Sequence, residues 1–191
     1  EGLDVLDGGS GNDKFDFNML KNIRQFPHEK FFNKKITDIN SAINNWDLAQ
    51  NNINLKNELI FLKTHAALVK INNIPFTNNK NTLGAIYIVR DPRDVLISYS
   101  SYMEKSMDET LKFMLNKETY EVGEFKKKIY NKTLLGSWSD HYNSWKNYKS
   151  REIIIIKYED MVNSASSTFL KVLTYLSKII KINVDHTKLD K

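Results

Sequence analysis

One stretch of the chain joins a short apolar run to the start of a helix: Ala85-Ile86-Tyr87-Ile88-Val89-Arg90-Asp91-Pro92-Arg93-Asp94. Its first five residues are rich in β-branched and aromatic side chains and have the length of a strand. Asp91 suits the N-cap of a helix, Pro92 its first position, and Asp94 can complete a capping box. The stretch therefore predicts a strand that ends at Val89 and a helix that begins just beyond Arg90.

Two further apolar runs of strand length lie at residues 59–62 and 153–156. Apolar residues also recur at helical spacing within residues 36–46, 134–145 and 169–180. Strands that are apolar on both faces and separated by helices favour a parallel β-sheet flanked by helices. We expect an α/β fold whose ligand lies outside the carboxyl ends of the strands.

The helix after Val89 offers an anion site. Its free N–H groups and the positive end of its dipole attract an anion, and Arg90 adds a planar guanidinium suited to a phosphate. Ser98 lies one turn beyond Asp94, where its hydroxyl can add a donor. The alternative is a capped helix in which Arg90 pairs with Asp94 or another carboxylate, and both interpretations stay open.

The residues that directly follow the other two predicted strands include further candidate site residues. The run at 59–62 leads into Lys63-Thr64-His65, where His65 has the chemistry of a general base, although a lone histidine is more often structural. The run at 153–156 leads into Lys157-Tyr158, where Tyr158 can stack on a base or ring. The alternative for Tyr158 is a half-buried aromatic residue that ends a strand.

Together, the segments that follow the three predicted strands resemble those of the sulfotransferases that depend on 3′-phosphoadenosine-5′-phosphosulfate (PAPS). Lys63-Thr64-His65 resembles the family's Lys-Thr-His segment, and Arg90 with Ser98 matches its 3′-phosphate signature. Tyr158-Glu159-Asp160-Met161 and residues 136–145 resemble two further family segments in the same order. The resemblance spans roughly residues 18–180 and implies a P-loop NTPase-like sulfotransferase fold.

The resemblance also implies a reaction, the in-line transfer of a sulfuryl group from PAPS to a hydroxyl or amine acceptor with no metal ion required. His65 is implied as the catalytic base, and Lys63 as the cation that stabilises charge at the transferring group. Arg90 and Ser98 are implied as ligands of the 3′-phosphate, and Tyr158 as the adenine contact. The acceptor class (sugar, lipid, small alcohol or protein) is left open.

Two family segments have no counterpart in this sequence. One is the Pro-Lys-Ser-Gly-Thr-Thr-Trp-like loop that holds the 5′-phosphosulfate, and the other is the basic, Gly-containing loop that completes the 3′-phosphate pocket. Because both segments bind the nucleotide, we expect residues 18–191 to be a partial sulfotransferase domain, a fragment with weakened PAPS binding and activity.

Residues 1–17 have a different composition, in which glycines alternate with aspartates. Within them, residues 8–15 resemble the calcium-binding nonapeptide of RTX-type repeats. One and a half repeats cannot stack, and such arrays are stabilised by their neighbours, so we expect weak or no calcium binding. A domain boundary is predicted near residue 17, with a partial RTX-like repeat before it.

The composition is that of a globular chain with a net charge of +5 and a pI of about 9.1, which favours anionic partners in general. The absence of cysteine excludes disulfides and Cys-based metal sites. Apolar runs are far shorter than the roughly 20 residues of a membrane span. We expect a nucleotide co-substrate and an acceptor as partners, no nucleic acid, and a cytoplasmic location, whereas the RTX-like segment alone suggests export.

Two alternatives to an enzyme of this family remain. The first is a non-enzymatic nucleotide-binding remnant attached to a secreted calcium-binding repeat protein. The second is a nucleotide kinase or related phosphotransferase, which shares the sheet architecture. The lack of a Walker-type loop and the spacing between Arg90 and Ser98 both count against the kinase.

Overall fold

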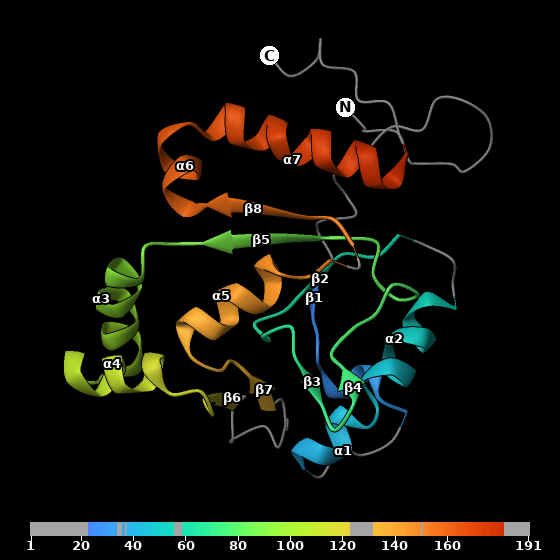
Figure 1. Cartoon of the computed structure of the whole chain (residues 1–191), viewed down its shortest axis with the longest axis horizontal. Helices are drawn as coiled ribbons and strands as arrows, with labels where there is room; N and C mark the ends of the chain where they lie inside the picture. The colour runs from blue at the N-terminus through green and yellow to red at the C-terminus, as the bar shows by residue number, and fades with distance from the viewer. Residues whose placement is uncertain are drawn as a thin grey trace.

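The computed structural model describes residues 23–33, 36, 38–55, 59–122, 132–149 and 151–181. A parallel pair of strands lies at its centre (Figure 1). β5 (Ala85–Val89) runs beside β8 (Ile153–Lys157), and Val89 at the end of β5 lies opposite Lys157. Both apolar runs therefore form strands as predicted, with β8 one residue longer than the run at 153–156.

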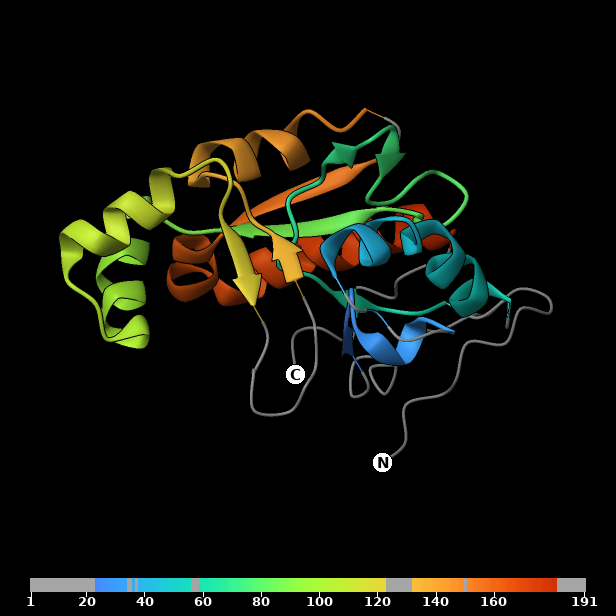
Figure 2. The same cartoon turned by 90° about the horizontal axis from the view of Figure 1, so that it is seen from below.

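Helices cover this strand pair on both sides, which confirms the predicted α/β fold. α7 (Ala165–Ile180) lies on one side and α5 (Trp138–Lys146) on the other, as Figures 1 and 2 show. α5 begins later than the helical spacing over 134–145 predicts. Gly136 before it has a left-handed φ of +67°, and the Ser137 side chain accepts a hydrogen bond from the Asp140 amide, so the helix starts just after that cap.

α3 and then α4 follow β5 at its carboxyl end, and α6 directly follows β8 (Figure 1). β6 and β7 pair with each other as a short antiparallel ribbon. No helix within the described ranges is long and apolar enough to cross a membrane. The bounds of these elements are α3 (Pro92–Met103), α4 (Met107–Leu115), β6 (Tyr120–Val122), β7 (Lys132–Leu134) and α6 (Tyr158–Asn163).

The part of the chain before β5 forms its own apolar cluster around short elements. Trp46 is its centre, with 1% of its surface exposed, and its ring meets Phe76 edge-on at 5.1 Å between centroids. Phe26, Ile43, Ala49 and Ala66 complete the buried set. The elements are β1 (Arg24–Gln25), η2 (Glu29–Phe31), α1 (Ile39–Ile43), α2 (Trp46–Asn54), β2 (Leu62–Lys63), β3 (Lys70–Ile71) and β4 (Ile74–Pro75).

Two predictions for this part need correction. The helical spacing over 36–46 is divided between α1 and α2, because Asn45 at the junction donates its side-chain amide to the Ser41 carbonyl, a local bond that competes with helix continuation. The apolar run at 59–62 contributes only its last residue to a strand. β2 pairs in parallel with β1, and the described residues thus contain two separate parallel pairs instead of one three-stranded sheet.

A glycine just before β5 allows α7 to approach the strand pair closely. Tyr175 on α7 donates its hydroxyl to the Glu152 carbonyl at 2.7 Å, at the start of β8. A Cβ at Gly84 would lie 2.2 Å from that hydroxyl oxygen and 3.0 Å from the same carbonyl. The contact therefore requires a residue without a side chain at position 84.

We predict that Gly84→Ala destabilises the chain by about 1–3 kcal/mol, because the new methyl overlaps a hydrogen-bonded hydroxyl. Urea unfolding measures the change. The double variant Gly84→Ala, Tyr175→Phe removes the atom that the methyl meets, so the two changes together should destabilise less than the sum of the single changes. Strict additivity would contradict this account of Gly84.

Candidate functional site

Arg90 and Tyr158 leave the sheet side by side. Arg90 directly follows β5 and Tyr158 directly follows β8, and the parallel register pairs the residues just before them, Val89 and Lys157. The Arg90 guanidinium carbon lies 4.7 Å from the centroid of the Tyr158 ring. Such a cation–π contact orients the guanidinium over the ring. Two residues separated by 68 positions in sequence thus form one local cluster.

Part of the Arg90 guanidinium lacks a partner within the described residues. A terminal nitrogen lies 3.7 Å from the Asp94 carboxylate, an i,i+4 ion pair in which the two side chains are 37% and 50% exposed. Its Nε is buried and makes no hydrogen bond to the described groups. An exposed ion pair at this distance contributes little, whereas an unsatisfied buried donor is unfavourable. The pairing with Asp94 is therefore present, and it leaves donors available for an anion.

Of the two hydrogen bonds predicted to cap the start of α3, one forms as predicted and the other has a different acceptor. The Asp91 carboxylate accepts from the Arg93 amide at 2.9 Å. Two further bonds from the Arg93 side chain to this carboxylate lower the pKa of Asp91 to about 2. The return bond of a capping box, predicted from Asp94, comes instead from Glu159 of α6, which accepts from the Asp91 amide at 2.8 Å.

Glu159 is a residue of this cluster to which the sequence pattern assigned no role. The hydrogen bond from the Asp91 amide is the largest cause that lowers the pKa of Glu159, so its carboxylate stays ionised. The one indication in the sequence that Glu159 belongs to this cluster was its position directly after Tyr158. Glu159 ties the helix that follows β5 to the helix that follows β8, at the edge where Arg90 and Tyr158 meet.

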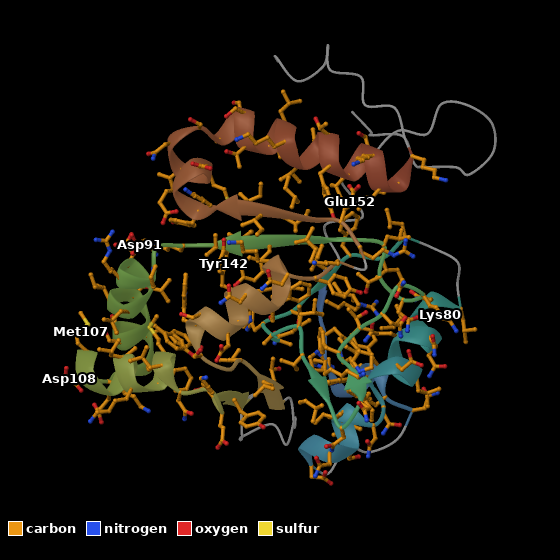
Figure 3. All side chains as sticks on the ribbon, viewed as in Figure 1. Lys80, Asp91, Met107, Asp108, Tyr142 and Glu152 are labelled. Atoms are coloured by element: carbon orange, nitrogen blue, oxygen red, sulfur yellow. The ribbon has the colours of Figure 1, made fainter. Side chains whose placement is uncertain are left out.

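Ser98 lies on the exposed surface of α3, and its hydroxyl donates to the Val95 carbonyl of the same helix at 3.2 Å. Figure 3 shows where this helix begins, since Asp91 is labelled at the junction of β5 and α3. The structure thus keeps Arg90 and Ser98 on one continuous strand-to-helix segment.

Lys63 and His65 lie at the end of β2, in the other parallel pair. The side chain of Lys63 is exposed, and its carbonyl accepts from the Phe26 amide at 2.8 Å. His65 is half-buried and opens a short loop, residues 64–68. The Thr64 hydroxyl accepts from the Ala66 amide at 3.0 Å, which closes a tight turn around His65.

One face of α5 holds the backbone of this loop. His141 Nε2 lies 3.0 Å from the His65 carbonyl, and Trp145 Nε1 donates to the Ala66 carbonyl at 3.0 Å. The Ser144 hydroxyl accepts from the Leu68 amide at 2.9 Å. Helical spacing indicated that His141 and Trp145 share a face, but the sequence pattern did not reveal that this face binds the loop after β2.

The same histidine reaches β5. The Tyr87 hydroxyl lies 2.9 Å from His141 Nδ1, and the two rings are 5.7 Å apart. Burial raises the pKa of Tyr87 to about 12, and the neighbouring Tyr142 adds to the rise. Burial also lowers the pKa of His141, against the opposing effect of the bond to the His65 carbonyl. Figure 3 shows α5 beside β5, with Tyr142 labelled between them.

The family profile described as "Sulfotransferase domain" matches residues 13–191, almost the whole chain. The chain belongs to the sulfotransferase family. The positions of the candidate site residues agree with this assignment, because Arg90, Tyr158 and the loop with His65 all follow parallel strands of an α/β fold.

Curated sulfotransferases are similar to the chain over part of their length. The chain is 30% identical to sulfotransferase 1C2 of Homo sapiens over 131 residues, which are 68% of the chain and 40% of that protein. It is 33% identical to an amine sulfotransferase of Oryctolagus cuniculus, over 53% of the chain and 31% of that protein. The chain therefore spans less than half the length of these relatives.

A solved structure supports the fold. The crystal structure of the mouse sulfotransferase SULT7A1 complexed with PAP superposes with a TM-score of 0.50 at 20% sequence identity, and the match covers 81% of this chain and 49% of that one. The predicted RTX-like repeat at residues 1–17 lies outside the described residues, and the boundary near residue 17 remains a prediction.

We predict that acidification destabilises the fold through His141. The folded state lowers the pKa of His141 below the ordinary value of 6.5, so the unfolded state takes up the proton first as the pH falls. The stabilisation is therefore complete above that value and is lost below it. Urea unfolding between about pH 7.5 and about pH 5 should show a shallower decline for His141→Gln than for the unaltered chain. Asn143→Gln, an exposed substitution on α5, serves as the control and should keep the original slope.

Proposed function

We propose that the chain forms part of a PAPS-dependent sulfotransferase that transfers a sulfuryl group to a hydroxyl or amine acceptor. The observation that carries the proposal is the Arg90 guanidinium, held over the Tyr158 ring at the start of α3 with a buried Nε that has no partner among the described groups. Membership of the sulfotransferase family supports the reaction class.

In this proposal the nucleotide binds at the joint end of β5 and β8. Arg90 and Ser98 hold the 3′-phosphate, and the free N–H groups at the start of α3 add to the attraction for an anion. Tyr158 is 41% exposed beside the guanidinium, which leaves ring surface for contact with adenine. The cation–π contact limits the motion of Arg90, so less entropy is lost when the phosphate binds.

The second part of the site is the loop after β2. His65 accepts the proton of the acceptor group as the new bond from oxygen or nitrogen to sulfur forms. The bond from sulfur to the phosphate oxygen breaks in line, and 3′-phosphoadenosine 5′-phosphate (PAP) leaves with the electron pair. Lys63, whose side chain is exposed at the end of β2, stabilises the charge on the transferring group. The protein's task is mainly positioning and charge stabilisation, as in phosphoryl transfer.

The relatives favour these two acceptor classes. One is named an amine sulfotransferase, and another, from Cavia porcellus, is named a 3-alpha-hydroxysteroid sulfotransferase, with 30% identity over 50% of the chain and 32% of that protein. We therefore propose that a nucleophilic hydroxyl or amine group reaches His65 here as well.

We predict that Arg90→Ala weakens PAP binding about 10- to 100-fold, the loss expected when a hydrogen-bonded charged partner of a phosphate is removed. Isothermal titration calorimetry with PAP measures it. Arg93→Ala is the matched control, because the Arg93 side chain is 87% exposed and already bound to Asp91, so its loss should change the affinity by less than about threefold. Equal affinities for Arg90→Ala and the unaltered chain would exclude Arg90 as the phosphate ligand.

We predict that His65→Ala lowers sulfuryl transfer by about 100-fold or more, because a general base is lost, while PAP affinity is retained. The assay follows labelled sulfuryl transfer from PAPS to a panel of phenols and amines. It uses the chain joined to the phosphosulfate loop and the 3′-phosphate loop of a curated relative. Activity that survives His65→Ala would rule out His65 as the base. PAP binding with no transfer in any variant would favour the nucleotide-binding remnant instead.

A further inference from the structure

Two side chains that carry no role in the proposed reaction connect the two parts of the site. Tyr87 lies on β5, three residues before Arg90, and its hydroxyl reaches His141 Nδ1 at 2.9 Å. The other ring nitrogen of His141 lies 3.0 Å from the carbonyl of His65. A continuous path of two hydrogen bonds therefore joins the strand that ends at the proposed phosphate ligand to the backbone of the proposed base.

The direction of both bonds follows from the chemistry of the groups. A backbone carbonyl can only accept, so Nε2 of His141 carries the proton that bonds to His65. In a neutral imidazole the other nitrogen is then an acceptor, and the Tyr87 hydroxyl donates to it. Burial, which lowers the pKa of His141, keeps the ring neutral near pH 7. The path thus selects one tautomer and one ring orientation.

The neighbouring bonds restrain the same loop from the same helix face. Positions 141, 144 and 145 are one turn apart, and Ser144 and Trp145 bind the backbone of Leu68 and Ala66. These two bonds attach the loop to α5 without any contribution from His141. The bond from His141 acts instead on the peptide group of residue 65 itself. The orientation of that carbonyl restricts ψ of residue 65, and because the allowed side-chain rotamers depend on φ and ψ, the bond favours particular χ1 rotamers of His65.

We propose that His141, held by Tyr87, is a positioning residue that orients the side chain of His65 relative to Arg90. The inference rests on the proposed function for its catalytic meaning. The geometry that carries it, a half-buried and directional path from β5 to the His65 carbonyl, does not depend on that function. Polar networks shielded from solvent rigidify their members when every group is satisfied.

The test compares two substitutions of His141 whose side-chain amides extend to different ring-nitrogen positions. The amide of His141→Gln extends to the position of Nε2 and can still donate to the His65 carbonyl. The amide of His141→Asn reaches only the position of Nδ1, so it keeps a partner for the Tyr87 hydroxyl and loses the bond to His65. Tyr87→Phe removes only the hydroxyl and serves as a third variant should His141→Asn fold poorly.

The first measurement uses the whole chain and no substrate. Three-bond NMR couplings to the ring carbon of His65 report whether its χ1 angle occupies one rotamer or averages over several. We expect one dominant rotamer in the unaltered chain. We expect partial averaging in His141→Gln and Tyr87→Phe, which keep the bond to residue 65 and lose the contact between positions 87 and 141. The strongest averaging is expected in His141→Asn, which loses the bond to residue 65. A single rotamer of His65 in a folded His141→Asn chain, or equal averaging in the Asn and Gln variants, would overturn the proposal.

The second measurement uses the chain completed with the two nucleotide loops. His141→Asn should lower kcat about 10- to 100-fold, with PAP affinity and the KM for PAPS unchanged, and His141→Gln should restore most of kcat. A fall in PAP affinity equal to the fall in kcat would indicate general loss of structure and contradict the positioning role. Failure of the proposed function is recognised separately, because transfer that survives His65→Ala refutes the base while the NMR couplings still test the path from His141 to residue 65.

Discussion

The parallel pairing of β5 with β8 is the constraint on which the rest of the structure depends. Its register brings Val89 and Lys157 to the same edge, and the next residues, Arg90 and Tyr158, therefore emerge as neighbours with the guanidinium over the ring. Both strands also run directly into helices at that edge. The bond between Glu159 and the Asp91 amide then joins those two helix starts, so the cation, the aromatic ring and the helix N-terminus form a single unit.

α5 extends this unit to a part of the chain with a different core. One side of the helix packs its aromatic residues against Tyr87 of β5, and the same helix bonds the backbone of the loop after β2 through His141 and Trp145. The two parallel strand pairs share no ladder within the described residues. Side-chain to backbone bonds from α5 therefore take the place of strand pairing in aligning the loop of His65 with the ends of β5 and β8.

Local patterns were reliable where a short stretch decides the conformation by itself. The run of β-branched residues before Arg90 forms β5, and Asp91 with Pro92 starts α3, because strand propensity and N-capping act within a few residues. Helical spacing over 36–46 was misleading for the same reason: it records which side chains face the core, and it is insensitive to the Asn45 bond that ends α1. The sequence predicted that Asp94 would accept the hydrogen bond from the Asp91 amide. That bond is present in the structure, but its acceptor is the carboxylate of Glu159, which is distant in sequence.

The sequence by itself determined the α/β class, the strand and helix around Arg90, and the identity of the residues proposed for the site, since each depends on neighbouring residues or on an ordered set of short motifs. Only the tertiary structure decided that β2 pairs with β1, that Glu159 caps α3, and that Tyr87 and His141 link β5 to the His65 carbonyl. These contacts join residues more than 30 positions apart. Their partners are selected by register, burial and the geometry of packed helices, which no local pattern contains.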